Sequence, residues 1–188
     1  MPLSRVAVDI GKEAKVAQDP FEGALKLNLG CGKSLMSNYI NVDWEQRLVA
    51  SLQLPPSTCF VCADSRRLPF KDALFDVVYS SHLFEHFEFY EAPEILDEWK
   101  RVLKRGGLLV ITVPNAKWFW RLFLESEDPE VLAQHFYAND RVYGYKGFRH
   151  RMMYTAKSLS KLLERCGFKV VAAIGDEAPA VSVRGLKV

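Results

Sequence analysis

The chain has 188 residues, enough for one domain with a modest appendage. Its 25 basic and 23 acidic side chains leave a formal net charge of +2, too balanced for a protein that binds by neutralising phosphates over a broad surface. With 49% apolar and 26% charged residues, the composition is globular and excludes a disordered tail, a fibre and a disulfide-bonded miniprotein. Aromatic residues make up an unusual 12%.

The sequence predicts a cytoplasmic protein with no membrane span. Residues 1–24 form a mixed, polar leader without the apolar core of a signal peptide. The most apolar run, Leu108–Val113, is far shorter than the roughly 20 residues that a spanning helix needs. Cys59 and Cys62 form a C-x-x-C inside an expected strand, where their side chains would face opposite sides. We therefore expect ordinary buried thiols there.

Short apolar runs alternate with turns and helical stretches along the chain. Continuous runs of Val, Ile and Leu are typical of parallel strands buried on both faces. Amphipathic spacing predicts helices over 91–104 and 155–166, each ended by glycine. The expected strands are 25–29, 39–43, 58–63, 75–80, 107–113, 168–174 and 181–188, the last two pairing as antiparallel neighbours.

This alternation predicts an α/β fold in a single domain, residues 1–188. The expected architecture is a doubly wound, mostly parallel seven-stranded sheet of Rossmann-like type, with an antiparallel last strand. We assign 25–113 to a cofactor-binding half and 114–150 to a helical, aromatic-rich insertion after strand five. Residues 151–188 supply the closing helix and strands.

Three strand ends carry the residues expected to bind a ligand, because open parallel sheets bind ligands beyond the carboxyl ends of their strands. Gly30-Cys31-Gly32 follows the first strand, and glycines there let backbone N–H groups approach a ligand closely. Asp43 ends the second strand and suits the vicinal hydroxyls of a ribose. Asp64 follows the third strand and suits an exocyclic amine. Together they predict an adenosine-containing ligand.

The order of these motifs resembles class I S-adenosylmethionine-dependent methyltransferases, most closely the small bacterial branch of type 11. The resemblance covers about residues 25–113, with a weaker echo over 155–170. The motifs that carry it are Leu27-Asn28-Leu29-Gly30-Cys31-Gly32, Asn41-Val42-Asp43, Ala63-Asp64, Leu68-Pro69-Phe70, Phe75-Asp76-Val77-Val78 and Leu103-Lys104-Arg105-Gly106-Gly107.

The resemblance implies S-adenosyl-L-methionine as cofactor and methyl transfer as the reaction. It places the glycine turn at the methionine part of the cofactor, Asp43 on the ribose, Trp44 beside the adenine, and Asp64 on the adenine amine. The full implied set is Asn28, Leu29, Gly30, Cys31, Gly32, Asp43, Trp44, Asp64, Ser65 and Ser80. Two departures stand out: Asn28 replaces an acid that many members carry, and the 33–38 linker is short.

His82 and His86 are the candidates for catalysis, because a general base assists transfer to a hydroxyl or an amine. In a helix they would share one face at i, i+4. Glu85 is misplaced for an H-E-x-x-H zinc motif and no third ligand is evident, so no metal is expected. The alternative for either histidine is a hydrogen bond to backbone near the pocket.

The insertion is interpreted as a lid that binds the methyl acceptor. Its aromatic residues are Trp118, Phe119, Trp120, Phe123, Phe136, Tyr137, Tyr143, Tyr145 and Phe148, which could equally pack a small helical subdomain or a dimer contact. A basic cluster of Arg141, Lys146, Arg149 and Arg151, near His135 and His150, suits an anionic acceptor or a solvated face.

The acceptor is therefore expected to be a small molecule or a sugar or glycan precursor, with an anionic one among the options. Nucleic acid is not expected, because the basic stretch is short and the whole chain is nearly neutral. Two alternatives stay open. One is a non-catalytic S-adenosylmethionine-binding module, and the other is an NAD-dependent oxidoreductase, disfavoured by the missing third glycine. The oligomeric state is not predicted.

Overall fold

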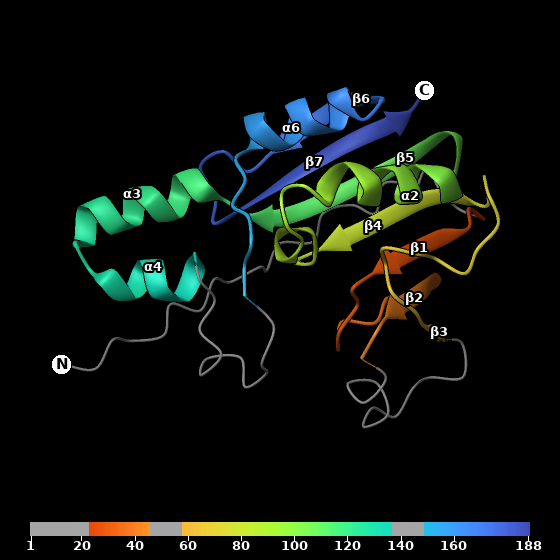
Figure 1. Ribbon diagram of the computed structural model, residues 1–188, viewed down its shortest axis with the longest axis horizontal. Helices are drawn as coiled ribbons and strands as arrows, with labels where there is room; N and C mark the ends of the chain where they lie inside the picture. Colours follow the sequence, from red (N-terminus) through yellow and green to blue (C-terminus); the bar gives the residue numbers. More distant parts are fainter. Residues whose placement is uncertain (1–22, 46–57, 137–148) are drawn as a thin grey trace, which may run out of the picture.

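Seven strands form one sheet in the order β3-β2-β1-β4-β5-β7-β6 (Figure 1). The structure is a computed structural model that describes residues 23–45, 58–136 and 149–188. All neighbours pair in parallel except β7, which is antiparallel to both β5 and β6. The strands are β1 Lys26–Leu29, β2 Tyr39–Asp43, β3 Cys59–Cys62, β4 Phe75–Ser81, β5 Leu103–Pro114, β6 Phe168–Ile174 and β7 Ala180–Lys187. This arrangement confirms the predicted sheet with its antiparallel last strand.

Two amphipathic helices cover the same face of this sheet (Figure 1). Helix α2 spans Ala92–Val102 and buries Ile95, Leu96, Trp99 and Val102. Helix α6 spans Ala156–Arg165 and begins with a capping box between Thr155 and Ser158, which satisfies backbone N–H groups at its first turn. No helix in the described ranges is long and apolar enough to cross a membrane.

The boundary between α2 and β5 differs from the expectation. The helix ends at Val102, and β5 begins at Leu103 instead of residue 107. Leu103 pairs with Phe75, and the register then jumps to Val77 opposite Leu108. The glycine-containing stretch between them interrupts the regular pairing of β5 with β4, so it does not simply follow the helix as predicted.

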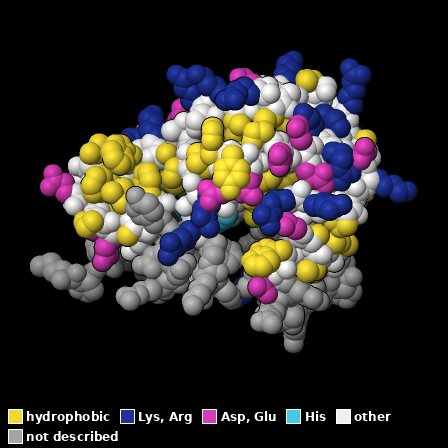
Figure 2. Space-filling model, viewed as in Figure 1, with side chains coloured by type: hydrophobic (Ala, Val, Ile, Leu, Met, Phe, Trp, Pro, Cys, Tyr) yellow, Lys and Arg dark blue, Asp and Glu magenta, His cyan; other side chains and the backbone are white. Residues whose placement is uncertain are grey.

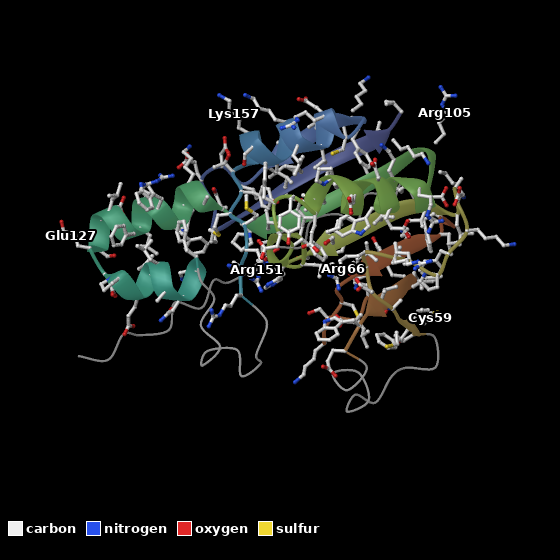
Figure 3. The ribbon with its side chains drawn as sticks, viewed as in Figure 1. Cys59, Arg66, Arg105, Glu127, Arg151 and Lys157 are labelled. Atoms are coloured by element: carbon white, nitrogen blue, oxygen red, sulfur yellow. The ribbon has the colours of Figure 1, made fainter. Side chains whose placement is uncertain are left out.

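The prediction of buried thiols at Cys59 and Cys62 is wrong. Both cysteines are exposed, and Figure 3 shows Cys59 at the outer side of β3. The physical reason is the place of β3 at the edge of the sheet, where β2 is its single partner among the described strands. The apolar run therefore predicted a strand correctly, but it did not indicate whether that strand lies in the centre or at the edge of the sheet.

The segment after β5 forms the predicted helical insertion. Helix α3 spans Ala116–Ser126, and α4 spans Pro129–His135, joined by Glu127 in the left-handed region. Rings from the two ends of this segment pack together. The ring centroids of Phe119 and His135 are stacked 4.0 Å apart, and those of Trp120 and Phe136 lie 6.2 Å apart. Hydrophobic side chains also gather on the outer surface of this pair of helices (Figure 2). The predicted aromatics from Tyr137 to Phe148, with Arg141 and Lys146, and the leader up to residue 22 lie outside the described residues.

Candidate functional site

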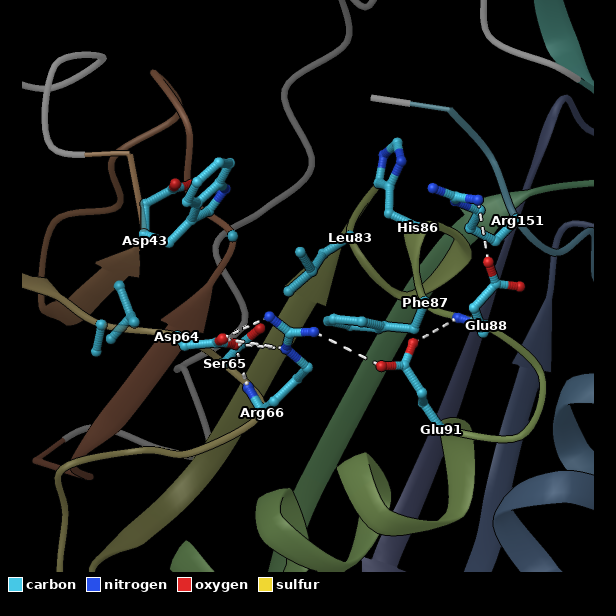
Figure 4. A pocket seen from close by; sticks show the side chains of 14 residues that line it. Asp43, Asp64, Ser65, Arg66, Leu83, His86, Phe87, Glu88, Glu91 and Arg151 are labelled. Atoms are coloured by element: carbon cyan, nitrogen blue, oxygen red, sulfur yellow. Dashed lines mark hydrogen bonds and ion pairs between the residues drawn. The ribbon is translucent and has the colours of Figure 1, made fainter. Parts of the chain in front are cut away.

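A cavity of about 320 Å³ lies beyond the carboxyl ends of β1, β2 and β3 (Figure 4). This is the edge at which a parallel sheet presents its strand ends and loops to a ligand. Its volume lies at the lower end of the range usual for small-molecule sites, about 300–1,000 Å³. The residues that line it are Gly30, Val42, Asp43, Trp44, Ala63, Asp64, Ser65, Arg66, Leu83, His86, Phe87, Glu88, Glu91 and Arg151.

The glycine turn and Asp43 are hydrogen-bonded to each other. Gly30 and Gly32 both have positive φ, +63° and +50°, which a residue with a side chain rarely adopts. The Gly32 N–H donates to Asp43 Oδ2 at 2.8 Å, and the Glu45 N–H donates to Oδ1 at 3.0 Å. A carboxylate oxygen has more than one acceptor site, so Asp43 retains acceptor capacity at the rim of the cavity.

The Asn28 side chain stabilises the loop that links β1 to β2. It is buried in β1, and its amide donates to Asn41 Oδ1 at 2.9 Å and to the Ser34 carbonyl at 3.2 Å. Asn41 in turn bonds backbone groups of Met36 and Cys59. This pair of buried amides holds the short linker against β2, where a full crossover helix would otherwise be expected. The two sequence departures are therefore structurally related.

The lining of the cavity carries more acid than base. Asp43, Asp64, Glu88 and Glu91 face two guanidinium groups. Arg66 holds Asp64 with contacts of 2.7–3.1 Å and reaches Glu91 at 3.6 Å, and its hydrogen bonds keep the pKa of Asp64 below the ordinary value. The second guanidinium, Arg151, pairs with Glu88 at 3.0 Å (Figure 4). The surplus of carboxylates favours a ligand with positive charge.

Five of the ten predicted cofactor residues line this cavity: Gly30, Asp43, Trp44, Asp64 and Ser65. The described lining does not include Asn28, Leu29, Cys31, Gly32 or Ser80, of which all but Gly32 are buried. Binding roles for all ten remain predictions. Sequence reasoning missed Arg66, Leu83, Glu88 and Glu91, because nothing in their local pattern distinguishes them from ordinary surface or core residues.

A second cavity of about 480 Å³ adjoins the first, and His86 lines both. Phe119 and His135 come from the α3–α4 insertion, so this insertion does contribute to a site. The residues that line the second cavity are His82, Glu85, His86, Pro114, Phe119, His135, His150, Pro179 and Ala180. Because the two cavities share one wall, ligands bound in both would be neighbours.

His82 and His86 both face this second cavity, but not through the helix that was considered. The segment holds a single 3-10 turn, η1 Phe84–His86, and His82 precedes it with φ +53°. His82 Nδ1 lies 3.3 Å from Glu85 Oε1, and this contact raises the pKa of His82 above its usual value. Burial lowers the pKa of His86, which favours its neutral form.

Asn115 organises the far wall of the second cavity. It is fully buried, and its side-chain amide donates to the carbonyls of Gly175, Asp176 and Ala178 at 2.9–3.1 Å. Its backbone N–H donates to the Pro179 carbonyl at 2.9 Å. Asn115 therefore positions the loop between β6 and β7; Pro179 of this loop and Ala180, the first residue of β7, line the cavity. The sequence predicted a loop between these two strands, but it did not indicate that Asn115 holds it in place.

Comparisons with known proteins show which proteins the chain resembles. A family model described as a methyltransferase domain, of type 11, matches residues 27–111. A malonyl-[acyl-carrier protein] O-methyltransferase of Herminiimonas arsenicoxydans is 32% identical over 96 residues, which are 46% of this chain and 35% of that protein. The mitochondrial arginine-hydroxylase NDUFAF5 of Homo sapiens is 28% identical over 174 residues, 87% of this chain and 47% of that protein. The chain thus spans less than half the length of these curated relatives.

Among solved structures, a SAM-dependent methyltransferase of Methanosarcina mazei has the same fold. The two superimpose with a TM-score of 0.65 at 21% sequence identity, and the match covers 88% of this chain and 92% of that chain. At this level of identity the likeness concerns the fold.

Proposed function

We propose that the chain transfers a methyl group from S-adenosylmethionine to a small-molecule or sugar-type acceptor, because a methyltransferase-domain model matches residues 27–111 and the sheet has the fold of a solved S-adenosylmethionine-dependent methyltransferase. The observation that carries this proposal is the pair of adjoining cavities. The acid-rich cavity at the strand ends suits the cofactor, and the second cavity meets it at His86.

The residues of the first cavity fit S-adenosylmethionine. Asp43, buried and already ordered by two backbone N–H groups, suits the two ribose hydroxyls. The Trp44 side chain is exposed beside it and offers a flat apolar surface for the adenine. Asp64 suits the adenine amine, since a carboxylate accepts hydrogen bonds only. The surplus of carboxylates suits the positive charges of the methionine part.

S-adenosylmethionine, when bound, supplies a methyl group on a sulfonium, which passes to a lone pair of the acceptor and leaves S-adenosylhomocysteine. The chain contributes orientation, which supplies about 7–11 kcal/mol in well-aligned reactions. For a hydroxyl or amine acceptor, His82 is the residue proposed to accept the proton. Glu85 lies beside its Nδ1, which leaves Nε2 as the nitrogen for this role. His86, on the shared wall, is proposed to orient the acceptor.

The cavity volume and lining support a small acceptor. About 480 Å³ is typical of a small-molecule site. Its described walls combine imidazoles and one carboxylate with Pro114, Phe119, Pro179 and Ala180, so they suit a partly apolar molecule with a few polar groups. No Lys or Arg belongs to the lining that the structure describes, and an anionic acceptor would therefore rely on histidine.

Calorimetry with S-adenosylmethionine, S-adenosylhomocysteine and NAD⁺ tests the cofactor. We expect the first two to bind and Asp43→Asn to weaken both by at least about tenfold, the loss that follows when a charged hydrogen-bonding partner is removed. The exposed Asp97 gives the control, Asp97→Asn, which should bind like the parent. Binding of NAD⁺ alone would overturn the proposal in favour of an oxidoreductase.

Transfer of labelled methyl to a panel of hydroxyl, amine and carboxyl compounds, including phosphorylated and nucleotide-linked sugars, tests the activity. Transfer that is lost in Asp43→Asn and reduced in His82→Gln supports the proposal. Tight cofactor binding without transfer to any acceptor would favour the non-catalytic binding module.

One observation favours a second candidate function, hydroxylation. The match to a protein named an arginine hydroxylase extends over 87% of this chain, well beyond the residues 27–111 that the family model covers. Mass spectrometry of products, with dioxygen and a reductant also supplied, distinguishes the two reactions. Methyl transfer adds a CH₂ unit to the acceptor, and hydroxylation adds one oxygen atom.

A further inference from the structure

All four histidines of the chain line the second cavity, together with Glu85. His82 and His86 come from the loop after β4, His135 from the end of α4, and His150 from the segment before α6. Nothing in the proposed methyl transfer requires more than one or two imidazoles at this place. The convergence of four imidazoles and one carboxylate on a single cavity therefore needs a separate explanation.

Glu85 is the centre of this group. Its side chain is fully buried, and neither carboxylate oxygen has a hydrogen-bond partner among the described residues. The ion-pair contacts of its carboxylate in the described part of the chain are both with imidazoles: His82 Nδ1 at 3.3 Å and His150 Nε2 at 3.9 Å. An ionised carboxylate removed from water costs several kcal/mol unless it is compensated, and an unsatisfied buried group can mark the place of an ion.

His86 and His150 are held in the same way. His86 Nδ1 lies 3.1 Å from the Arg149 carbonyl, and His150 Nδ1 lies 2.8 Å from the His135 carbonyl. A carbonyl only accepts, so each contact holds the ring proton on Nδ1 and gives Nε2 the lone pair. This second hydrogen bond from the ring to a backbone carbonyl is the usual support of histidines that bind a metal.

The distances are close to those of a metal site. The ligand atoms of Glu85, His86 and His150 all lie within 4.8 Å of one another. Bound to one ion at 2.0–2.2 Å, such atoms would lie roughly 3.3–3.5 Å apart. Side-chain movements of about an ångström would therefore close the three groups around an ion.

We infer that Glu85, His86 and His150 form a binding site for a divalent transition-metal ion. Two imidazole nitrogens and one carboxylate oxygen are the protein ligands of many catalytic Zn²⁺ centres and of non-haem Fe²⁺ centres. Three protein ligands leave coordination positions open, and here these face the cavity beside the shared wall at His86. The inference concerns binding of the ion and stands independently of methyl transfer.

The test measures metal binding directly. Protein stripped with a chelator is titrated with Zn²⁺ against a chromophoric competitor, and with Co²⁺ by visible absorption. Because Cys59 and Cys62 are exposed and could capture zinc, all measurements use a background in which both are serine. We expect one equivalent of saturable binding and Co²⁺ bands typical of nitrogen and oxygen ligands.

The variants separate ligands from neighbours. Glu85→Gln and His150→Gln should each weaken Zn²⁺ binding by about 100-fold or more, since even supporting residues of metal sites are worth 10–100-fold. His135→Gln is the matched control, because its ring stacks on Phe119 while its backbone carbonyl remains. It should bind within a few fold of the parent. If Glu85→Gln does not fold, the histidine variants decide the question.

Two results would overturn the inference. One is a folded parent protein that shows no saturable Zn²⁺ or Co²⁺ binding in the micromolar range. The other is binding that persists unchanged in His86→Gln and His150→Gln. A failure of S-adenosylmethionine to bind would bear on the proposed function and leave the metal measurement unaffected.

Discussion

Trp99 of α2 donates its indole N–H to the Ser65 carbonyl at 2.9 Å, and both residues are buried. Trp99 belongs to the hydrophobic core, on the buried face of α2, whereas Ser65 lines the first cavity. The hydrogen bond therefore connects the core helix directly to the loop that follows β3. The position of that loop, and with it Asp64, depends on how α2 packs.

Trp99→Phe should lower both stability and cofactor affinity. The change keeps an aromatic ring but leaves the Ser65 carbonyl without its donor, at a cost of about 1–2 kcal/mol in the free energy of unfolding. Denaturant unfolding and calorimetry with S-adenosylhomocysteine measure the two effects. Trp120→Phe is the control, because Trp120 is half-exposed on α3. Equal losses in both variants would contradict the structural connection.

Gly30→Ala should damage the first cavity far more than Gly32→Ala. Both positions have positive φ, so both variants carry some backbone strain, about 1–2 kcal/mol. A Cβ at Gly30 would lie 2.8 Å from the Leu83 Cβ, whereas a Cβ at Gly32 would meet nothing within 4 Å. We expect Gly30→Ala to weaken S-adenosylhomocysteine binding by at least about tenfold.

The double variant Gly30→Ala, Leu83→Gly supplies the control for this clash. It should recover part of the lost affinity, because glycine at position 83 removes the Cβ and both Cδ atoms that would lie 2.8–2.9 Å from the added methyl group. Calorimetry on the three variants measures the series. No recovery in the double variant would assign the loss to backbone strain alone.

Asn115→Ala should destabilise the fold and disturb the second cavity. The change leaves three backbone carbonyls of the 175–178 loop without their shared donor, at a cost of about 2–3 kcal/mol. Thermal and denaturant unfolding measure the loss. Asp176→Ala, at an exposed side chain of the same loop, should change stability by less than about 0.5 kcal/mol. Similar effects of the two changes would argue against Asn115 as the anchor.

Glu98 should make stability depend on pH in the acid range. Its carboxylate accepts from the Leu68 N–H and from two nitrogens of Arg101, each at 2.7 Å, and these bonds lower its pKa below the ordinary value of 4.5. Because the folded state then binds fewer protons than the unfolded chain, the contribution is present above pH 4.5. It is lost as the pH falls through the lowered pKa.

Glu98→Gln should therefore reduce the free energy of unfolding by about 1–2 kcal/mol near neutral pH and flatten its decline in acid. Denaturant unfolding at a series of pH values measures this. Glu94→Gln, at an exposed position on the same helix, should keep the slope of the parent. An unchanged acid slope in Glu98→Gln would refute the assignment.

The cysteines should differ strongly in reactivity. Cys59 and Cys62 are exposed, whereas Cys31 is buried within the glycine turn, and burial raises its pKa to about 12. Since the thiolate is the reactive form, iodoacetamide should modify Cys59 and Cys62 more than about 100-fold faster than Cys31 in the native protein. Peptide mass spectrometry measures the rates, with unfolded protein as the control. Rapid native labelling of Cys31 would contradict its placement.

Much of the fold was predictable because its determinants are local. The apolar run of each strand and the residues that end it lie within a few positions of one another, and strand β6, Phe168–Ile174, matches its prediction at both ends. The predictions were wrong where a strand's boundary or exposure depends on which strands pair with it. The early start of β5 depends on the partner Phe75, and the exposure of Cys59 depends on the place of β3 at the sheet edge. Neither property is written in the local pattern.

By itself the sequence determined the α/β sheet and the edge at which the predicted cofactor residues lie, because the carboxyl ends of parallel strands necessarily meet on one side. Asp43 and Asp64 were identified in this way. Only the tertiary structure brought His135 and His150 to Glu85 and His86. Those residues lie on segments that meet only through long-range contacts, such as His150 Nδ1 with the His135 carbonyl and the Arg151 N–H with the Glu85 carbonyl. Such contacts leave no periodic trace in the chain.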